Sequence, residues 1–482
     1  MEIHMIGHAS LFIETKDCRI LIDPVLWDPH QEGLFDVCPK REVIHELLPE
    51  FDLLIISHQH LDHFDLRSLA YLPKTVDVFI PRDKLIENYL RKLGYSRIHY
   101  LKDFAEVKIG STSLLATRSE YRVPEHGIVL ADQSGVCWNH VDTVVSPNTI
   151  NFVLSRYSNI DFLLARWQPN LEVNYQTNQS ISFPYSGYGK LLGNISLIQP
   201  KALAPGANGF KYINESSWLN QVVFPVTREK FCRDAKLACP GLEENIFSLD
   251  PGDVLIFEQG EFHHLAGKCE YVQTLVDDRE SLDFSPVNVG CNLKDSNPDN
   301  YDLEVMKEVI KEEISINLPS FMNENREKLF REHCRWQVIY QLEVVFPNSS
   351  QKWYFDFSEL TIKAVEGRNP LANFFTYITA SSFYSLLQQT KGWDYVYLGG
   401  YTRSFQKIYS VNPLGVVRPE AIKIEEPIQL KIPGNQSLEK ILDREIEIWG
   451  QSPVDSSKSK LNNFSNPKLK IEDNLPNWSS LF

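Results

Sequence analysis

The sequence of 482 residues lacks features that define several common classes of protein. No apolar run approaches the roughly 20 residues of a membrane span, and Met1-Glu2-Ile3-His4 does not begin a signal-peptide pattern. Basic residues are few: 48 Lys and Arg stand against 63 Asp and Glu, for a net charge of −15. Because nucleic acids and anionic membranes attract clustered Lys and Arg, the sequence predicts neither as a partner.

Cysteine is also sparse. The eight cysteines are scattered along the chain, and no two have the C-x-x-C spacing. Unpaired cysteines suit a reducing compartment, so we expect a cytoplasmic location. The length allows two or three domains with a sizeable core.

Four side chains of the kind that bind metals lie within residues 58–63, which read H-Q-H-L-D-H. They directly follow the apolar run 51–57, which predicts a buried strand of a parallel sheet. The first two histidines project to one side of an extended segment, whereas the aspartate and third histidine come where the chain turns toward a helix expected at 64–71. Imidazole and carboxylate suit Zn, Fe or Mn, and the four donors leave positions open for water or substrate.

The pattern H-x-H-x-D-H after a strand resembles the metallo-β-lactamase superfamily. The resemblance implies an α/β fold, an αββα sandwich of two sheets between helices. It also implies two metal ions. His58, His60 and a later histidine would hold one of them, and Asp62, His63 and a bridging carboxylate the other.

The beginning of the chain extends this resemblance. Residues 5–14 and 19–24 predict two strands, the second stopped by proline. Their I-G-H-A-S and I-D-P resemble the opening hairpin of the branch that includes ascorbate-phosphate lactonase and the phospholipase D that acts on N-acyl-ethanolamine lipids. In that branch Asp23 would lie beneath the ligands and orient a histidine. The alternative is a turn residue before proline.

The remaining ligands are expected in a hairpin at residues 124–143. His126 precedes its first strand and Asp142 follows its second, where resembling proteins place the third histidine and the bridging carboxylate. The family glycine before that aspartate is Val141 here. His140 is the alternative ligand.

A final histidine is missing from its expected place. The strand expected at 200–205 is followed by G-A-N-G-F, without histidine. The next histidines in the chain are His263 and His264, and the segment that contains them is typical of a terminal hairpin of the domain. We therefore expect Asn208, Glu215 or water to substitute at the second metal.

A narrower resemblance fits the missing histidine. Residues 204–210 and the run W-D-Y-V-Y-L-G-G-Y-T-R at 393–403 look like the CMP-N-acetylneuraminate hydroxylase family. That family carries a Rieske iron-sulfur domain, which needs both a Cys-x-His and a Cys-x-x-His, and this chain has no Cys-x-His. The resemblance therefore implies an oxygenase whose electrons come from a separate partner, without implying activity on CMP-sialic acid.

A carboxylate-rich site is a further expectation. The di-iron β-hydroxylase of amino acids tethered to peptide synthetases also has H-x-H-x-D-H, but it replaces a histidine by a carboxylate. Glu120 and Glu125 lie near His126 in the sequence and are candidates for such a substitution, with exposed loop positions as the alternative.

The domain organisation follows from composition shifts. We expect the metal domain at 1–272, a linker at 273–300 and a smaller α+β domain at 301–425, with strands at 336–346, 352–365 and 393–403 and a helix at 371–389. This second unit looks somewhat like a sterol-carrier-type fold, with a structural or dimerising role as the alternative. Residues 426–482 are expected to form a partly disordered tail.

Three functional classes compete. The favoured one is a dinuclear iron oxygenase that hydroxylates or N-oxygenates a small metabolite with external electrons. The second is a zinc hydrolase in which a metal-bound hydroxide attacks an ester, lactone or phosphodiester. The third is a metal-dependent binding protein. Two divalent ions are expected in each enzyme, with iron favoured over zinc. The expected partners are a small-molecule substrate, an electron donor and a second copy of the chain.

Overall fold

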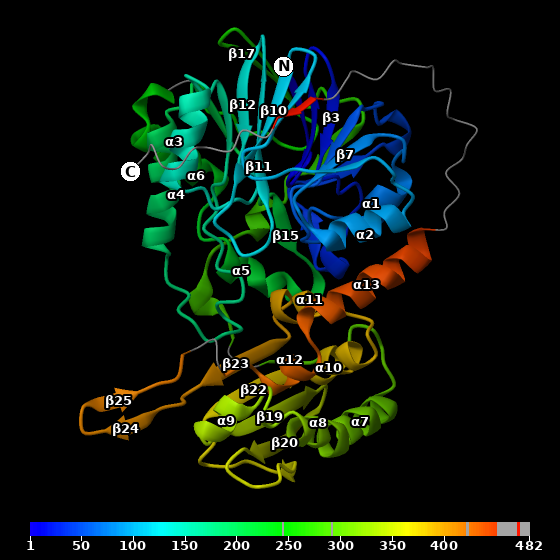
Figure 1. The fold of residues 1–482 in the computed structure, drawn as a ribbon, viewed down its shortest axis with the longest axis vertical. Helices are drawn as coiled ribbons and strands as arrows, with labels where there is room; N and C mark the ends of the chain where they lie inside the picture. The colour runs from blue at the N-terminus through cyan, green and yellow to red at the C-terminus, as the bar shows by residue number, and fades with distance from the viewer. Residues whose placement is uncertain (243–244, 291–292, 421–423, 451–469, 473–482) are drawn as a thin grey trace.

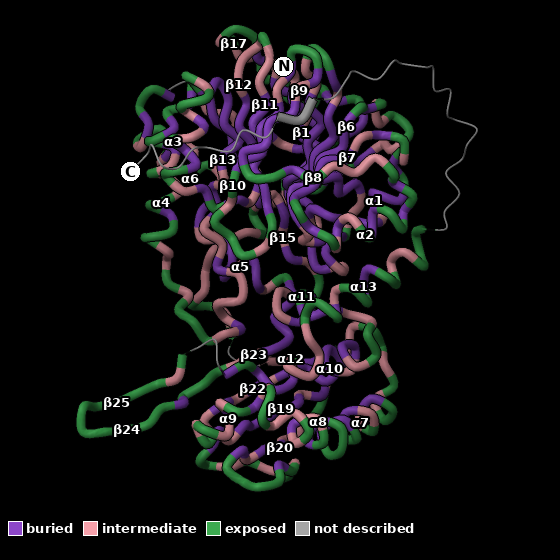
Figure 2. The backbone as a smooth tube through the Cα atoms, in the orientation of Figure 1, coloured by how far each residue is buried: buried purple, intermediate pink, exposed green. Residues whose placement is uncertain are grey.

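A computed structural model describes residues 1–242, 245–290, 293–420, 424–450 and 470–472. Figure 1 shows two lobes. The larger lobe has two facing β-sheets with helices on their outer sides, and the smaller lobe is built around a single sheet. Buried residues lie mainly along the strands of the two sheets of the larger lobe (Figure 2).

The first sheet carries the metal-type motif. The apolar residues of β6 are fully buried because parallel neighbours flank the strand and both of its faces are covered. In spatial order the eight strands are β17 (Glu261–Leu265), β16 (Val254–Glu258), β1 (Glu2–Gly7), β2 (Ser10–Glu14), β3 (Arg19–Ile22), β6 (Leu53–Ile55), β7 (Asp77–Ile80) and β8 (Ile98–Tyr100).

The second sheet has seven strands. β11 and β12 form the hairpin predicted from the sequence, and β12, β13 and β14 run parallel, so their carboxyl ends meet at one edge. In spatial order the strands are β14 (Ala202–Pro205), β13 (Phe162–Ala165), β12 (Gly135–Asn139), β11 (His126–Asp132), β10 (Thr112–Arg118), β9 (Glu106–Ile109) and β26 (Lys470–Glu472).

Helices cover the outer face of each sheet. Near the first sheet lie α1 (Leu66–Tyr71) and α2 (Lys84–Lys92). Near the second lie α3 (Pro147–Arg156), α4 (Tyr185–Ile198) and α6 (Arg228–Ala238). A third apolar cluster fills the space between the sheets. These layers confirm the expected αββα sandwich.

Short elements join the lobes. Two small antiparallel pairs, a four-residue helix and 3-10 turns lie around the sandwich, and the expected linker 273–300 begins within one of these pairs. The pairs are β4 (Phe35–Val37) with β15 (Phe210–Tyr212) and β5 (Lys40–Val43) with β18 (Val272–Val276), and the helix is α5 (Asn220–Val223). The 3-10 turns are η1 (Gln31–Gly33), η2 (His45–Leu47), η3 (Asn214–Leu219), η4 (Pro240–Leu242), η5 (Arg279–Ser281) and η6 (Pro286–Asn288).

The second domain is α+β, as expected. Its sheet has the order β21 (Val365–Glu366), β20 (Ser349–Asp356), β19 (Ile339–Phe346), β22 (Phe374–Thr379) and β23 (Thr402–Gln406). A hairpin of β24 (Ser410–Asn412) and β25 (Gly415–Val417) projects from the body (Figure 1). The helices are α7 (Leu303–Glu312), the π-helix η7 (Glu313–Asn317), α8 (Leu318–Glu324), α9 (Arg331–Arg335), α10 (Ala380–Leu387) and α11 (Trp393–Leu398).

Two of its elements differ from the sequence-based expectation. The helix expected at 371–389 is a strand, β22, followed by α10, because buried and half-exposed residues first alternate along the chain. The strand expected at 393–403 begins as helix α11. Its aromatic and β-branched residues favour strands, but Trp393 and Val396 are three apart and bury one face of a helical turn.

The expected tail begins with two helices, α12 (Pro427–Lys431) and α13 (Gly434–Trp449). Apolar residues at 438, 441, 442 and 446 form a helical stripe, and α13 packs against α1 and α2 of the first domain. Residues 451–469 and 473–482 of the expected tail lie outside the described ranges.

Within the described ranges, every helix is too short or too polar to cross a membrane.

The packing of α13 on the first domain gives a stability prediction. Leu442 is fully buried in the cluster of α1 and α2, whereas Ile448 on the same helix is 54% exposed. Leu442→Ala should lower the free energy of unfolding by roughly 2–5 kcal/mol because it opens a cavity. Ile448→Ala should change it by less than about 0.5 kcal/mol. Chemical denaturation followed by circular dichroism tests this, and equal effects of the two substitutions would contradict the packing.

Candidate metal centre

The motif loop brings two imidazole nitrogens together. After β6 ends, the amides of His63 and Phe64 both donate to the carbonyl oxygen of His60, which turns the chain toward α1. Within this turn His58 Nε2 lies 2.8 Å from His60 Nδ1. His58 Nδ1 is 2.9 Å from the Ser57 hydroxyl. The two inward nitrogens therefore converge from an edge-to-face pair of rings.

Asp23 orients the third histidine of the motif. Asp23 is fully buried at the end of β3 with a φ of +43°, and Oδ1 accepts from the Ser57 amide at 2.7 Å. Its Oδ2 accepts from the Ser57 hydroxyl at 2.6 Å and lies 2.9 Å from His63 Nδ1. Because a carboxylate only accepts, Nδ1 of His63 carries a proton, and Nε2 is the nitrogen that would face a metal ion.

The free nitrogen of His63 faces two carboxylates. It lies 3.3 Å from Asp142 Oδ2 and 3.9 Å from Asp62 Oδ2. His63 Nε2 and Asp142 Oδ1 are buried and have no hydrogen-bond partner among the described residues. Since buried polar atoms are otherwise nearly always satisfied, this donor set fits a metal ion.

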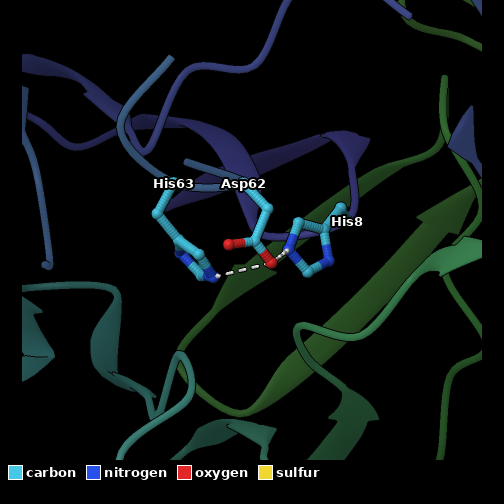
Figure 3. A group of neighbouring side chains, drawn as sticks. All are labelled: His8, Asp62 and His63. Atoms are coloured by element: carbon cyan, nitrogen blue, oxygen red, sulfur yellow. Dashed lines mark hydrogen bonds and ion pairs between the residues drawn. The ribbon is translucent and has the colours of Figure 1, made fainter. Parts of the chain in front are cut away.

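Ligand atoms gather in two overlapping groups. His58, His63 and Asp142 form one, and His8, Asp62 and His63 form the other; within each, the atoms lie within 4.8 Å of one another. Figure 3 shows the second group, with Asp62 between His63 and His8.

His8 supports Asp62. The backbone amide of Asn208 donates to His8 Nδ1 at 3.1 Å, so Nδ1 is the accepting nitrogen and the proton of the neutral ring is on Nε2. That nitrogen donates to Asp62 Oδ2 at 3.1 Å. With both nitrogens engaged, the ring holds the carboxylate in place and has no lone pair left for a metal.

The charge states suit cation binding. Burial, His63 and His60 hold the pKa of His58 well below its usual range, so its ring is neutral. Burial would raise the pKa of Asp142, but His63 and His58 outweigh it and lower that pKa. Burial opposes charge on His63, yet Asp62 and Asp142 raise its pKa well above the ordinary value. A metal ion would therefore displace a proton from His63 when it binds.

His126 lies beside the motif but outside both groups. Its amide donates to the Ser57 carbonyl at 3.2 Å, which places the start of β11 next to the motif loop. Its Nε2 lies 3.3 Å from Asp103 Oδ1, and its buried Nδ1 has no partner within the described ranges. An imidazole with a carboxylate on one nitrogen and a free second nitrogen has the pattern of a metal ligand.

His140, the alternative ligand, packs edge-to-face against Trp138, with the two ring centroids 4.7 Å apart. Burial and the charge of Arg166 lower the pKa of His140 to about 3.

Carboxylates surround these ligands. Glu125 is buried, accepts from the Ser119 hydroxyl at 2.6 Å, and has its pKa raised to about 7 by burial and by Asp142. Glu172 has its pKa raised to about 7 by burial, Asp62 and Asp142. Both side chains are therefore close enough to the centre to sense its charges.

Glu172 was missed by the sequence analysis because no motif marks it. It follows β13, the strand between the one that leads to Asp142 and the one that leads to Asn208, and this topology is the signal that locates it. Asn170 Nδ2 donates to Glu172 Oε1 at 3.1 Å and to Asn208 Oδ1 at 2.5 Å.

The candidate substitute ligands differ in position. Asn208 is buried with a φ of +76°. Its backbone amide donates to His8 Nδ1, and its side-chain oxygen accepts a hydrogen bond from Asn170. Glu215 is exposed in the 3-10 turn at 214–219. Glu120 is also exposed, and its Oε2 lies 3.5 Å from Arg118.

The second domain reaches the centre. The Gly392 amide donates to Glu32 Oε1 at 2.9 Å, and Lys391 Nζ donates to the Glu32 carbonyl at 2.8 Å. The next acidic residue, Asp394 at the start of α11, has its pKa raised by burial, and the charges of His60 and Asp62 act on it. The W-D-Y-V run therefore contributes to the surroundings of the candidate metal centre.

A family model matches part of the first lobe. Residues 2–144 match the family model described as a beta-lactamase superfamily domain. The match covers the amino-terminal half of the first lobe, and the lobe has the metallo-β-lactamase αββα fold. The narrower resemblance to the CMP-N-acetylneuraminate hydroxylase family stays a prediction.

Individual relatives match parts of the chain. A Mycobacterium tuberculosis (strain H37Rv) protein that carries the name of a Rieske 2Fe-2S iron-sulfur protein is 27% identical over 172 residues, 33% of each chain. The 4-amino-L-phenylalanyl-(CmlP-peptidyl-carrier-protein) 3-hydroxylase of Streptomyces venezuelae is 27% identical over 119 residues, 23% of this chain and 22% of that protein. The match to the first of these relatives thus spans about a third of its length.

Among solved structures, the isothiocyanate hydrolase from Delia radicum gut bacteria is 19% identical. The alignment covers 54% of this chain and 99% of that one, with a TM-score of 0.40.

The converging histidines of the motif give a metal-binding prediction. His60→Ala should remove most of the bound metal because a three-histidine site loses a third of its strong donors. Metal analysis of the purified variant measures the loss. His263→Ala, which removes an exposed histidine of β17, is the matched control and should keep full occupancy. Full occupancy in both variants would show that the assignment of His60 is wrong.

The hairpin that carries Asp142 and His140 gives a second prediction. Only a carboxylate has two oxygens that can bridge two cations, so Asp142→Ala should empty the site to a much greater extent than His140→Ala. Metal content and thermal unfolding of both variants, measured with and without a chelator, separate metal loss from misfolding. An emptied site in His140→Ala together with a filled site in Asp142→Ala would reverse the assignment.

Proposed function

We propose that this protein is a dinuclear metalloenzyme. His58, His60 and His126 would hold one ion, and Asp62, His63 and the bridging Asp142 the other. The buried atoms of His63 and Asp142 that lack a hydrogen bond, and the neutral ring of His58, support this ligand set. Asp23 and His8 would position the ligands through the hydrogen bonds described above.

Two irons are favoured over zinc because the surroundings are rich in oxygen donors. Glu125 and Glu172 add carboxylates to those of Asp62 and Asp142, and Asn208 follows the strand where a final histidine is expected. Mixed shells of histidine and carboxylate with open positions are typical of iron oxygenases. This gathering of carboxylates is the observation that carries the proposal.

The reaction would be hydroxylation or N-oxygenation of a small metabolite. Bound iron would supply the activation of dioxygen. With pKa values near 7, Glu125 and Glu172 can hold or release a proton beside the centre at neutral pH. The relative named as a 3-hydroxylase supports the reaction class.

Electrons would come from outside the chain. A Rieske cluster needs a Cys-x-His together with a Cys-x-x-His, and none of the eight cysteines begins a Cys-x-His. A separate ferredoxin or reductase, or a substrate that donates its own electrons, is therefore part of the proposal. The relative named as a Rieske protein supports a link to iron-sulfur electron transfer.

Zinc-dependent hydrolysis of an ester, lactone or phosphodiester is the second candidate. The group of His58, His63 and Asp142 favours it, because two imidazoles and one carboxylate form a common catalytic zinc set. Such an enzyme would need neither dioxygen nor a reductant.

The two candidates predict opposite requirements. The iron-loaded protein should consume dioxygen with substrate only when a reductant is present, because dioxygen activation needs electrons that this chain does not carry. The zinc-loaded protein should consume none. An oxygen electrode, with candidate small metabolites and a ferredoxin–reductase pair, measures this. Release of a hydrolysed product by the zinc form under anaerobic conditions would overturn the oxygenase in favour of the hydrolase.

A further inference from the structure

Arg166 lies at the carboxyl end of β13, between two neighbouring strands of the second sheet. It follows the last residue of β13, and the two neighbouring strands, β12 and β14, run parallel to it. The chain beyond β12 leads to Asp142, and the chain beyond β14 leads to Asn208. Since the carboxyl ends of parallel strands meet at one edge, the backbone of Arg166 lies between the segments that lead to Asp142 and to Asn208.

The side chain of Arg166 belongs to the face between the two sheets. Along this segment Leu163, Ala165 and Trp167 contribute to the apolar cluster under the outer helices. Phe162 and Leu164 contribute to the cluster between the sheets. Because successive side chains of an extended segment alternate, Arg166 shares the inner face with Phe162 and Leu164, at the end where the metal-type ligands gather.

The guanidinium of Arg166 has no bonded partner among the residues that the structure describes. It makes no hydrogen bond and no ion pair with any described residue, although it is only partly exposed. Its charge acts on Glu125, Glu172 and Tyr121, all of which surround the centre. A half-buried arginine without a partner is unusual, because five donors need acceptors.

No described carboxylate forms an ion pair with this cation, so its charge can act on a molecule that enters the site. A guanidinium presents a planar fork of donors that matches the two oxygens of a carboxylate or phosphate.

We propose that Arg166 binds an oxyanion of the substrate, so that the substrate is a small molecule with a carboxylate or phosphate group. This inference rests on the proposed dinuclear centre and adds the substrate class. Arg166 would hold the anionic end of the molecule and thereby present another part of it to the metal ions.

Calorimetric titration of the zinc-loaded full-length protein with acetate and with inorganic phosphate tests the inference. At least one anion should bind, and Arg166→Gln should weaken its binding on the order of 10- to 100-fold while the metal content stays unchanged. Arg166→Lys keeps the positive charge but loses the planar pair of N–H donors, so this variant should bind the anion with intermediate affinity. Tighter binding of acetate would indicate a carboxylate substrate, and tighter binding of phosphate a phosphorylated one.

The matched control is Arg335→Gln, which removes an exposed arginine of α9 and should leave anion binding unchanged. Unaltered affinity in Arg166→Gln, loss of metal in that variant, or no binding of either anion by the unsubstituted protein would each overturn the inference. The zinc form needs no dioxygen, so these results are independent of the oxygenase test. Intact anion binding without oxygen consumption by the iron form would reject the oxygenase alone.

Discussion

The buried carboxylate of Asp23 is the constraint on which the centre depends. It accepts hydrogen bonds from Ser57 and faces His63, so it joins the end of β3, the end of β6 and the motif loop. A fully buried carboxylate is tolerated only when its oxygens are satisfied. These hydrogen bonds satisfy Asp23 and at the same time fix the tautomer and direction of the imidazole that faces Asp62 and Asp142.

The candidate metal centre lies where the two sheets and the second domain meet. The first sheet supplies Asp23 and the motif loop, and the second supplies His126, Asp142 and Glu172 from its strand ends and hairpin. The second domain is tied to the first by hydrogen bonds from residues 391 and 392 to Glu32, and it brings Asp394 toward His60. One apolar cluster also runs through both, from Phe35 and Phe210 to residues of the five-stranded sheet. The second domain is therefore part of the surroundings of the site.

The sequence predicted the parts of this arrangement that depend on short-range pattern. The motif at 58–63 and the hairpin that carries His126 and Asp142 follow from fixed spacings and strand periodicity. The layered α/β class followed from the resemblance of the motif to the metallo-β-lactamase superfamily. The sequence could not locate Glu172 or Arg166, because a parallel sheet brings them to the site from a segment without a motif. The sequence patterns also gave wrong predictions for α11 and for part of the tail. Short aromatic runs favour strands, so α11 was predicted as a strand. The apolar stripe of α13 indicates a packed helix only when its contacts with α1 and α2 are known.

The central claim is that this fold holds two irons among histidines and carboxylates. Metal analysis and Mössbauer spectroscopy of the full-length protein, expressed with iron enriched in the Mössbauer isotope and purified without oxygen, test it most directly. The account predicts about two irons per chain in nitrogen and oxygen coordination. Zinc at that stoichiometry, or a single metal ion whose content does not change in Asp142→Ala, would contradict it.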